Sequence, residues 1–261
     1  MDMAESPVTA QQADGVLTLT LNRPGQFNAL SEEVLASLQE ALDRAARDET
    51  LRCVVLSAEG RAFCAGHDLK QMQANRNHEY YLALFRQCGR VMQTIVNFPV
   101  PVIAKVQGIA TAAGCQLVAS CDLAVAADTA KFAVSGINVG LFCSTPAVAL
   151  SRNVAAKKAF EMLITGEFIS AQDAQQHGLI NHAVPVHELD AHVDALVSQI
   201  CEKSPVAVRT GKAMFHRQRV MALDAAYEFA ADTMARNMMA EDVLEGIDAF
   251  INKRTPTWKG R

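Results

Sequence analysis

The chain has 261 residues, a length that suits one α/β domain with an additional terminal element. Half of its residues are hydrophobic and 20% are charged, so it can bury a sizeable core and is not a disordered chain. The net charge is −4, and no run of Lys and Arg is long enough to form a basic face for nucleic acid. We therefore expect no nucleic-acid partner.

The seven cysteines indicate reduced, mostly buried thiols. Their number is odd, and no CxxC pair or Cys/His cluster is present, so the sequence favours neither a disulfide framework nor a metal site. Residues 1–5 are acidic and lack an apolar core, unlike a signal peptide or a basic transit peptide. We expect a cytoplasmic location, or the mitochondrial matrix if a transit peptide has been removed.

The first elements in chain order are typical of an α/β fold. Residues 1–14 are predicted to form a flexible tail, and the alternation over 16–21 predicts a strand. Ser31, followed by two glutamates, predicts the start of a helix that continues to about residue 45. Residues 53–56 are apolar without alternation, which predicts a strand covered on both faces. A longer helix is predicted over 78–98, where Pro99 and Pro101 follow.

The second half continues with a strand over 102–106, a helix over 111–120 and a strand over 123–126. The longest uncharged run, 132–151, contains Gly, Asn and Pro, so it predicts a buried strand–loop–helix rather than a membrane span, and we expect no membrane insertion. Four helices are predicted over 188–202, 205–219, 221–238 and 240–252. We predict an α/β core over 15–200 and a C-terminal helical region over 201–261.

Two segments combine small residues with a predicted helix start: 62–70 and 108–117. Small residues let the backbone approach a ligand closely, and unpaired N–H groups at a helix start stabilise negative charge. Two such amides that converge on one oxygen form an oxyanion hole. Either segment alone is more typical of ordinary packing.

Together, these segments resemble the enoyl-CoA hydratase/isomerase (crotonase) family over about residues 15–254. The resemblance implies a fold of repeated ββα units with C-terminal helices that mediate trimerisation, as a homotrimer or a dimer of trimers. It implies an acyl-CoA thioester as the substrate, with coenzyme A as part of it and no separate cofactor. A nicotinamide cofactor is not expected, because no dinucleotide-binding fingerprint is present. The matching motifs are residues 21–24, 28–30, 63–69, 101–108, 113–124, 163–166, 170–174, 178–180 and 249–254.

The resemblance also implies roles for individual residues. The thioester carbonyl would lie between the backbone amides of His67 and Ala113, with Ala113 standing where the family usually has Gly. Lys70 matches a position near the CoA phosphates, whereas Phe250 and Lys253 match C-terminal positions that often serve a neighbouring subunit. Further substrate contacts are implied for Ala65, Asp68 and Leu69. The simpler alternative is that Asp68 caps a helix and that the lysines are solvated.

Two positions depart from the family. Hydratases of this family use two glutamates, and these fall on Gln116 and Gly136, neither of which carries a carboxylate. General acid–base catalysis contributes about 10² to 10⁴ per group, so we expect poor hydration by the two-glutamate route. Cys143 as a nucleophile would need a base and a lowered pKa, and the sequence shows neither.

The imidazole of His67 leaves two alternatives open: it takes part in acid–base chemistry, or it satisfies a carbonyl along its loop, which we favour. Asp122 is expected to be structural. The first functional hypothesis is therefore an atypical acyl-CoA-processing enzyme of the family. A non-catalytic acyl-CoA-binding protein is the second, and another oxyanion-stabilised reaction, such as thioester hydrolysis or decarboxylation, is the third.

Overall fold

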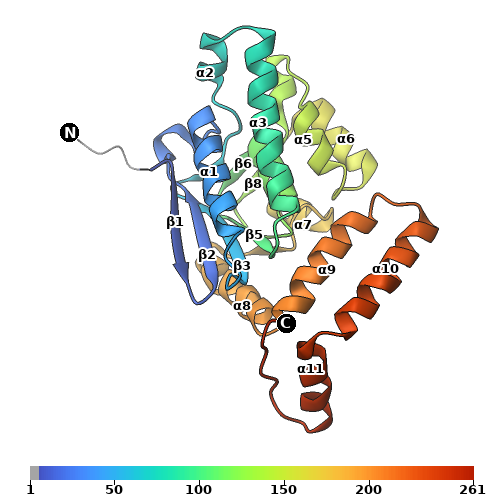
Figure 1. Cartoon of the computed structure of the whole chain (residues 1–261). Helices are drawn as coiled ribbons and strands as arrows, with labels where there is room; N and C mark the ends of the chain where they lie inside the picture. Colours follow the sequence, from blue (N-terminus) through green and yellow to red (C-terminus); the bar gives the residue numbers. More distant parts are fainter. Residues whose placement is uncertain (1–5) are drawn as a thin grey trace.

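A computed structural model describes residues 6–261 and contains two β-sheets (Figure 1). The six-stranded sheet has the order β1-β2-β3-β5-β7-β10, and only its β1–β2 pair is antiparallel. The four-stranded sheet has the order β4-β6-β8-β9, and its β8–β9 pair is antiparallel. The strands are β1 (Val8–Ala13), β2 (Val16–Leu21), β3 (Cys53–Ala58), β4 (Ala62–Cys64), β5 (Val102–Val106), β6 (Ile109–Thr111), β7 (Leu123–Ala127), β8 (Lys131–Ala133), β9 (Ile169–Ser170) and β10 (His182–Val184).

The expected ββα repeat is confirmed. Each of β3, β5 and β7 in the large sheet is followed by a short strand of the small sheet, β4, β6 or β8, and then by a helical segment. The core helices are α1 (Glu32–Ala45), α2 (Leu69–Ala74), α3 (His78–Val96), α4 (Ala113–Ser120), α5 (Ser144–Leu150), α6 (Ala156–Thr165) and α7 (Ala171–Gln176). Ser31 caps α1 as predicted, because its side chain accepts a hydrogen bond from the Val34 amide.

Strand β3 shows why its apolar run does not alternate. Val54 and Leu56 face the main core, whereas Val55 faces a second cluster that contains Val125 and Val193. Helix α8 therefore covers one face of the large sheet, and the other face is buried in the main core. The prediction of a sheet covered on both faces is confirmed.

The predicted tail over 1–14 is wrong for residues 8–13, which form β1 and pair with β2 over its whole length. Asp14 and Gly15 both have positive φ, 50° and 76°, which is the geometry of a tight hairpin turn. The Asp-Gly pair was the available signal for this hairpin. Residues 1–5 of the predicted tail lie outside the described residues.

The uncharged run 132–151 forms β8, a turn and α5, as predicted, but its turn is exposed rather than buried. Val139 is 66% exposed, and Leu141 and Phe142 are also exposed. Within residues 6–261, no helix has the length and apolar character needed to cross a membrane. All seven cysteines are free and five are buried, which confirms that the thiols are mostly buried.

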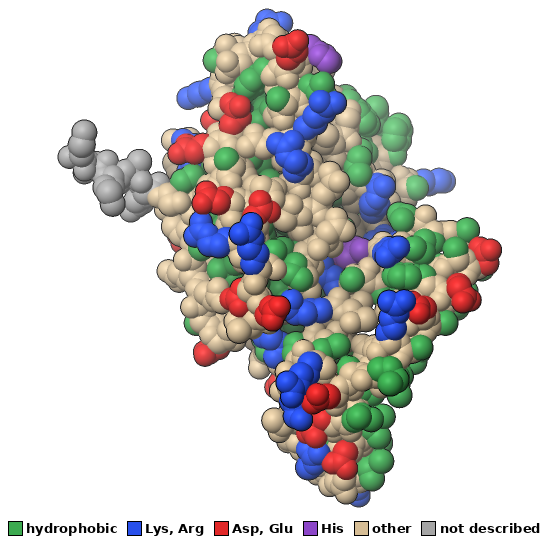
Figure 2. Space-filling view, viewed as in Figure 1, with side chains coloured by type: hydrophobic (Ala, Val, Ile, Leu, Met, Phe, Trp, Pro, Cys, Tyr) green, Lys and Arg blue, Asp and Glu red, His purple; other side chains and the backbone are tan. Residues whose placement is uncertain are grey.

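The four predicted C-terminal helices are α8 (Leu189–Cys201), α9 (Pro205–Gln218), α10 (Leu223–Met238) and α11 (Glu241–Ile251). Helix α8 packs on the sheet, whereas α10 and α11 stand away from the body (Figure 1). Together, α10 and α11 form the C-terminal arm. Helix α10 has no buried residue, and apolar side chains gather along the arm (Figure 2). Met239 and Phe250, for example, are 83% and 85% exposed.

Candidate functional site

The two small-residue segments meet at the carboxyl edge of the four-stranded sheet. Strand β4 leads to His67, its parallel neighbour β6 leads to Ala112 and α4, and β8 leads to the turn that contains Gly136. Carboxyl ends of adjacent parallel strands share one edge, which is where open α/β sheets hold ligands. The structure therefore brings together the loop of His67, the start of α4 and Gly136.

Contact between the first two segments depends on glycines. A Cβ built on Gly66 would lie 3.3 Å from the Ala113 nitrogen and 2.8 Å from the Ala112 Cβ. A Cβ on Gly114 would collide with the carbonyl oxygen of Cys64. Glycine at these two positions thus allows the β4 loop to lie directly against the beginning of α4.

The backbone amides of His67 and Ala113 are unpaired in the described part of the chain. Within residues 6–261, neither N–H donates a hydrogen bond to a protein acceptor. Ala113 is the first residue of α4, so its N–H is one of the donors that no helix can satisfy internally, and it lies at the positive end of the helix dipole. An oxygen carrying partial negative charge is the ligand that such a pair fits.

The turn into α4 is strained. Ala112 has φ 50° and ψ −120°, a conformation that favours glycine, and its N–H donates to Ala133 O at 3.0 Å. Strained backbone of this kind is concentrated at functional sites.

Gln116 lies in the first turn of α4 and is buried, with 4% of its surface exposed. Its side-chain oxygen Oε1 is buried and has no hydrogen-bond partner within residues 6–261. An amide can orient a water or a ligand but cannot accept a proton as a carboxylate does.

The position of Gly136 is closed to any side chain. A Cβ there would lie 2.7 Å from Cys143 Sγ and 2.7 Å from the backbone oxygen of Leu141. The exposed turn thus folds back against Gly136, the position at which the family resemblance predicts a missing glutamate. Burial raises the pKa of the Cys143 thiol, which is opposite to the lowered pKa that a nucleophilic cysteine needs.

His67 places its ring between two neighbouring segments. Its Nδ1 lies 3.3 Å from the Leu30 carbonyl oxygen, and its ring meets Phe85 of α3 edge-on at 5.4 Å. The imidazole thus satisfies a carbonyl, as favoured, although on an adjacent segment rather than on its own loop. Its Nε2 is buried and has no partner within residues 6–261. Burial lowers the pKa of His67 from its ordinary 6.5, a shift that the Leu30 contact opposes, so the ring is neutral near pH 7.

The other expected substrate contacts are scattered. Asp68 caps α2, because its Oδ1 accepts from the amides of Lys70 and Gln71 at 3.0 and 3.1 Å. Leu69 and Lys70 are exposed on that helix, and Ala65 donates its N–H to Phe27 O. Phe250 and Lys253 belong to the C-terminal arm, at the opposite end of the molecule from α2 (Figure 1). Within one chain, Phe250 and Lys253 therefore do not lie near the loops that contain His67 and Ala113.

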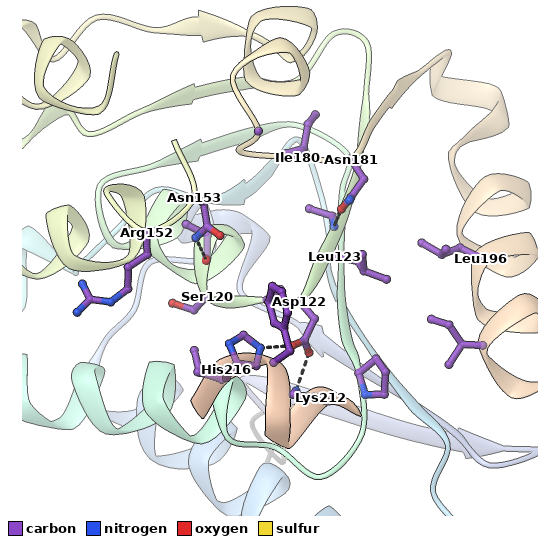
Figure 3. Close-up of a pocket in the computed structure, with 18 of the residues that line it drawn as sticks. Ser120, Asp122, Leu123, Arg152, Asn153, Ile180, Asn181, Leu196, Lys212 and His216 are labelled. Atoms are coloured by element: carbon purple, nitrogen blue, oxygen red, sulfur yellow. Dashed lines mark hydrogen bonds and ion pairs between the residues drawn. The ribbon is translucent and has the colours of Figure 1, made fainter. Parts of the chain in front are cut away.

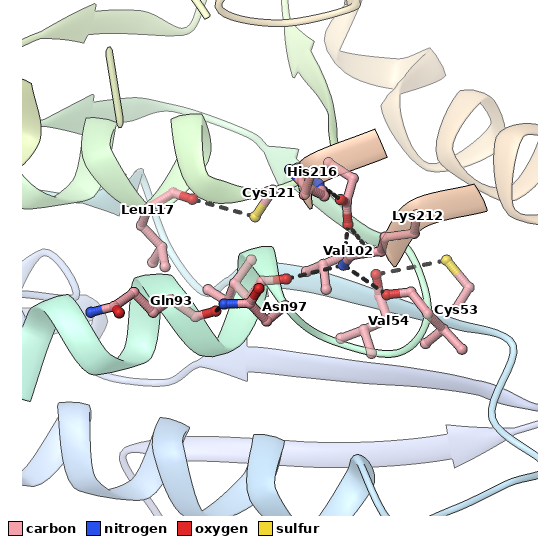
Figure 4. A network of polar contacts seen from close by, with 12 residues as sticks. Cys53, Val54, Gln93, Asn97, Val102, Leu117, Cys121, Lys212 and His216 are labelled. Carbon is pink, nitrogen blue, oxygen red and sulfur yellow. Dashed lines mark hydrogen bonds and ion pairs between the residues drawn. The ribbon is translucent and has the colours of Figure 1, made fainter. Parts of the chain in front are cut away.

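At the opposite end of α4, Asp122 joins a fully bonded network. Its carboxylate accepts from Lys212 Nζ at 2.6 Å and contacts His216 Nε2 at 2.8 Å (Figure 3). The network around Val102 and Lys212 (Figure 4) also includes the Val102 amide, which donates to Asp122, and the Ile95 and Val100 carbonyls, which accept from Lys212. Burial lowers the pKa of Lys212, and the neighbouring Asp122 carboxylate opposes that shift. The network fastens α9 to the core, in keeping with the structural role expected for Asp122.

A cavity of about 950 Å³ lies beside this network, between the core and helices α8 and α9 (Figure 3). Its lining includes Ser120, Asp122, Lys212 and His216 but neither His67 nor Ala113. Sequence analysis did not identify Lys212 and His216 as partners in one network. Their four-residue spacing on one helix places both side chains on the same face and could have indicated it. Within residues 6–261, no group of three or more His, Cys, Asp and Glu residues is placed to hold a metal ion.

Comparisons with known proteins agree with this architecture. The family model for enoyl-CoA hydratase/isomerase matches residues 11–261. The human mitochondrial enoyl-CoA hydratase domain-containing protein 3 is 47% identical, over 97% of this chain and 83% of that protein. The 2,3-dehydroadipyl-CoA hydratase of Escherichia coli (strain K12) is 34% identical, over 99% of this chain and 100% of that protein.

Two solved structures are also similar. An enoyl-CoA hydratase from Mycobacterium smegmatis has 58% identity and a TM-score of 0.96, and the match covers 97% of this chain and 99% of that chain. The structure of the human domain-containing protein 3 has 47% identity and a TM-score of 0.94, with 97% and 100% covered. The chain therefore belongs to the enoyl-CoA hydratase/isomerase family and has the crotonase fold.

Proposed function

We propose that this protein binds acyl-CoA thioesters at the edge formed by β4, β6 and β8. In this proposal, the thioester carbonyl accepts hydrogen bonds from the amides of His67 and Ala113. The observation that carries it is the pair of unpaired amides on loops in direct contact, one of them at the start of α4. Such donors stabilise the negative charge that an enolate or a tetrahedral intermediate places on the same oxygen.

The protein is proposed to process acyl-CoA without the two-glutamate hydration route. Gln116 holds a water or a polar ligand atom, and Gly136 contributes no side chain. A non-catalytic acyl-CoA-binding protein remains the alternative from another class. Thioester hydrolysis and decarboxylation are the alternatives within enzymes, because both need the oxyanion donors but not a carboxylate at residue 116 or 136.

The proposal extends to the rest of the ligand and to self-association. Lys70 contacts the CoA phosphates, and Phe250 and Lys253 reach the CoA of a neighbouring subunit in a homotrimer or a dimer of trimers. The exposed apolar residues of α10 and α11 support this arrangement, because they have no core to cover within one chain. Sedimentation at micromolar concentration tests it, and a monomer would contradict it.

Calorimetry with a series of saturated and unsaturated CoA thioesters tests the binding proposal. We expect heat of binding with the unmodified protein. The variant Gly114→Ala forces the Cys64 carbonyl away from α4 and so separates the two amides. We expect it to weaken binding about two- to tenfold, because a hydrogen bond to the neutral thioester carbonyl is worth about 0.5–1.5 kcal/mol.

Gly89→Ala is the matched control, because a methyl group at that position of α3 has no neighbour within 4 Å. It should bind as the unmodified protein does, and circular dichroism should show both variants folded. Absence of binding by the unmodified protein at millimolar thioester would overturn the proposed function. Unchanged binding by folded Gly114→Ala would overturn the assignment of the two amides.

A further inference from the structure

His67 contributes two different polar groups to the edge of the small sheet. Its backbone N–H is unpaired, and its ring nitrogen Nδ1 lies 3.3 Å from the Leu30 carbonyl oxygen. A carbonyl oxygen can only accept, so Nδ1 of the neutral ring carries the hydrogen and donates it. The other ring nitrogen, Nε2, therefore holds an unshared electron pair and acts as an acceptor.

This acceptor is left without a partner. Nε2 is buried, and within residues 6–261 nothing donates to it. A buried polar atom without a hydrogen bond costs about 1–3 kcal/mol, so a purely structural histidine would be expected to satisfy both nitrogens. The histidine at the other end of α4, His216, uses its Nε2 to contact Asp122 at 2.8 Å.

No other side chain described at this edge offers a free neutral base. Gln116 is an amide, Gly136 has no side chain, and the pKa of Cys143 is raised by burial, which keeps the thiol protonated. The Asp68 carboxylate is engaged in capping α2. The imidazole of His67 is thus the one neutral base at the edge within the described residues.

We propose that Nε2 of His67 accepts a proton from the α-carbon of a bound acyl thioester, a step that rests on the proposed function. The electron pair of the C–H bond moves into the bond between the α-carbon and the carbonyl carbon, and the carbonyl π pair moves to oxygen. The amides of His67 and Ala113 stabilise that oxygen. One residue thus supplies both the proposed base and one of the two proposed oxyanion donors.

The reverse step completes a reaction without an oxidant or a reductant. The imidazolium exchanges its proton with water and returns a solvent proton to the α-carbon. The substrate class is a saturated or unsaturated acyl-CoA with a hydrogen on its α-carbon. Exchange of that hydrogen with solvent is the expected observable reaction.

The experiment follows deuterium incorporation into butyryl-CoA in D₂O by mass spectrometry, together with calorimetry of butyryl-CoA binding. We expect the unmodified protein to incorporate deuterium above the rate without protein. His67→Asn keeps a donor for the Leu30 carbonyl but lacks Nε2. It should lower the exchange rate at least about 10²-fold, which is typical of a lost general base, while Kd changes less than about threefold, under 1 kcal/mol.

His182→Asn is the matched control, because it removes an imidazole that is exposed on β10, and it should leave the exchange rate unchanged. Exchange by folded His67→Asn at the unmodified rate would overturn the role of His67. Binding of butyryl-CoA without deuterium exchange in the unmodified protein would also overturn the role of His67, but it would leave the proposed function standing. Absence of binding would overturn the proposed function itself.

A measurement on the unmodified protein covers the case in which the variant does not fold. In ¹⁵N NMR, the Nε2 resonance of His67 should have the shift of an unprotonated nitrogen and should move when butyryl-CoA is added. A protonated Nε2 in the free protein, or a resonance that butyryl-CoA leaves in place, would overturn the proposal.

Discussion

The two ends of helix α4 treat their polar groups in opposite ways. At its start, Ala112 is strained, and the amides of His67 and Ala113, the oxygen Oε1 of Gln116 and the nitrogen Nε2 of His67 have no partner in the described part of the chain. At its end, the Asp122 carboxylate is bonded by Lys212, His216 and the Val102 amide. The distance between these regions is one short helix of eight residues.

This difference distinguishes the candidate ligand site from a structural joint. Unpartnered buried groups cost free energy unless something binds them, whereas a fully bonded ion pair holds two elements together. A cavity lies beside the Asp122 network at the end of α4, which we call the bonded end. The chemistry expected from the family lies at the start of α4, which we call the unbonded end. Hydrogen-bond satisfaction is the better guide here, because a cavity by itself shows only that space exists.

The largest effect expected from this contrast concerns hydration. The unbonded end has no carboxylate at residue 116 or 136, so turnover with crotonyl-CoA should be at least about 10³-fold below that of a family member with both glutamates, since each acid–base group contributes about 10² to 10⁴. Absorbance or mass measurement of the hydrated product checks this. A turnover comparable to that of such a member would contradict the argument and would show that another residue manages the proton.

The next effect is on stability at the bonded end. Asp122→Ala leaves the buried Lys212 without its counter-charge, so the free energy of unfolding should fall by about 3–5 kcal/mol. Denaturant unfolding measures it. Asp190→Ala removes the carboxylate of a surface pair with Lys105 and should cost less than about 1 kcal/mol. Equal losses in the two variants would show that the network is not the joint described.

A smaller loss is expected from Gly136→Ala. The new methyl group would meet Cys143 Sγ and the Leu141 oxygen at 2.7 Å each, and such overpacking costs about 1–3 kcal/mol. Thermal unfolding measures the loss, with Gly89→Ala as a control that should be neutral or stabilising. A stable Gly136→Ala would mean that the turn yields easily. In that case Glu could be introduced at residues 116 and 136 without redesign of the turn.

Sequence reasoning predicted the long elements because their patterns are local. Helix α1 has a capping serine and a continuous apolar face, and β3 has an uninterrupted apolar run. Strands of two or three residues, such as β4, β6 and β9, are too short for a periodic pattern. Strand β1 was missed because most of its residues are polar and exposed, although the Asp-Gly turn marked the hairpin.

The candidate site was predictable only in part for the same reason. Motif resemblance predicted roles for the amides of His67 and Ala113 and the departures at Gln116 and Gly136, and these roles stay predictions. The partners of side chains depend on contacts far apart in sequence, such as Lys212 with Asp122, which are 90 residues apart. Neither the Leu30 contact of His67 nor the closure of the turn over Gly136 could be derived without the folded chain.

The smallest effect tests the strain at the unbonded end. Ala112→Gly removes a side chain from a backbone conformation that costs about 1–3 kcal/mol, although glycine also makes the unfolded chain more flexible by about 0.4–1 kcal/mol. We expect a net gain of about 1 kcal/mol in the free energy of unfolding, measured with denaturant. Ala119→Gly, near the bonded end of the same helix, should instead lose about 1 kcal/mol, because its backbone is an ordinary helical one. If Ala→Gly raises the free energy of unfolding at residue 112 and lowers it at residue 119, the strain lies at the start of α4. A loss in both variants would mean that the Ala112 side chain is held there by packing that outweighs the strain.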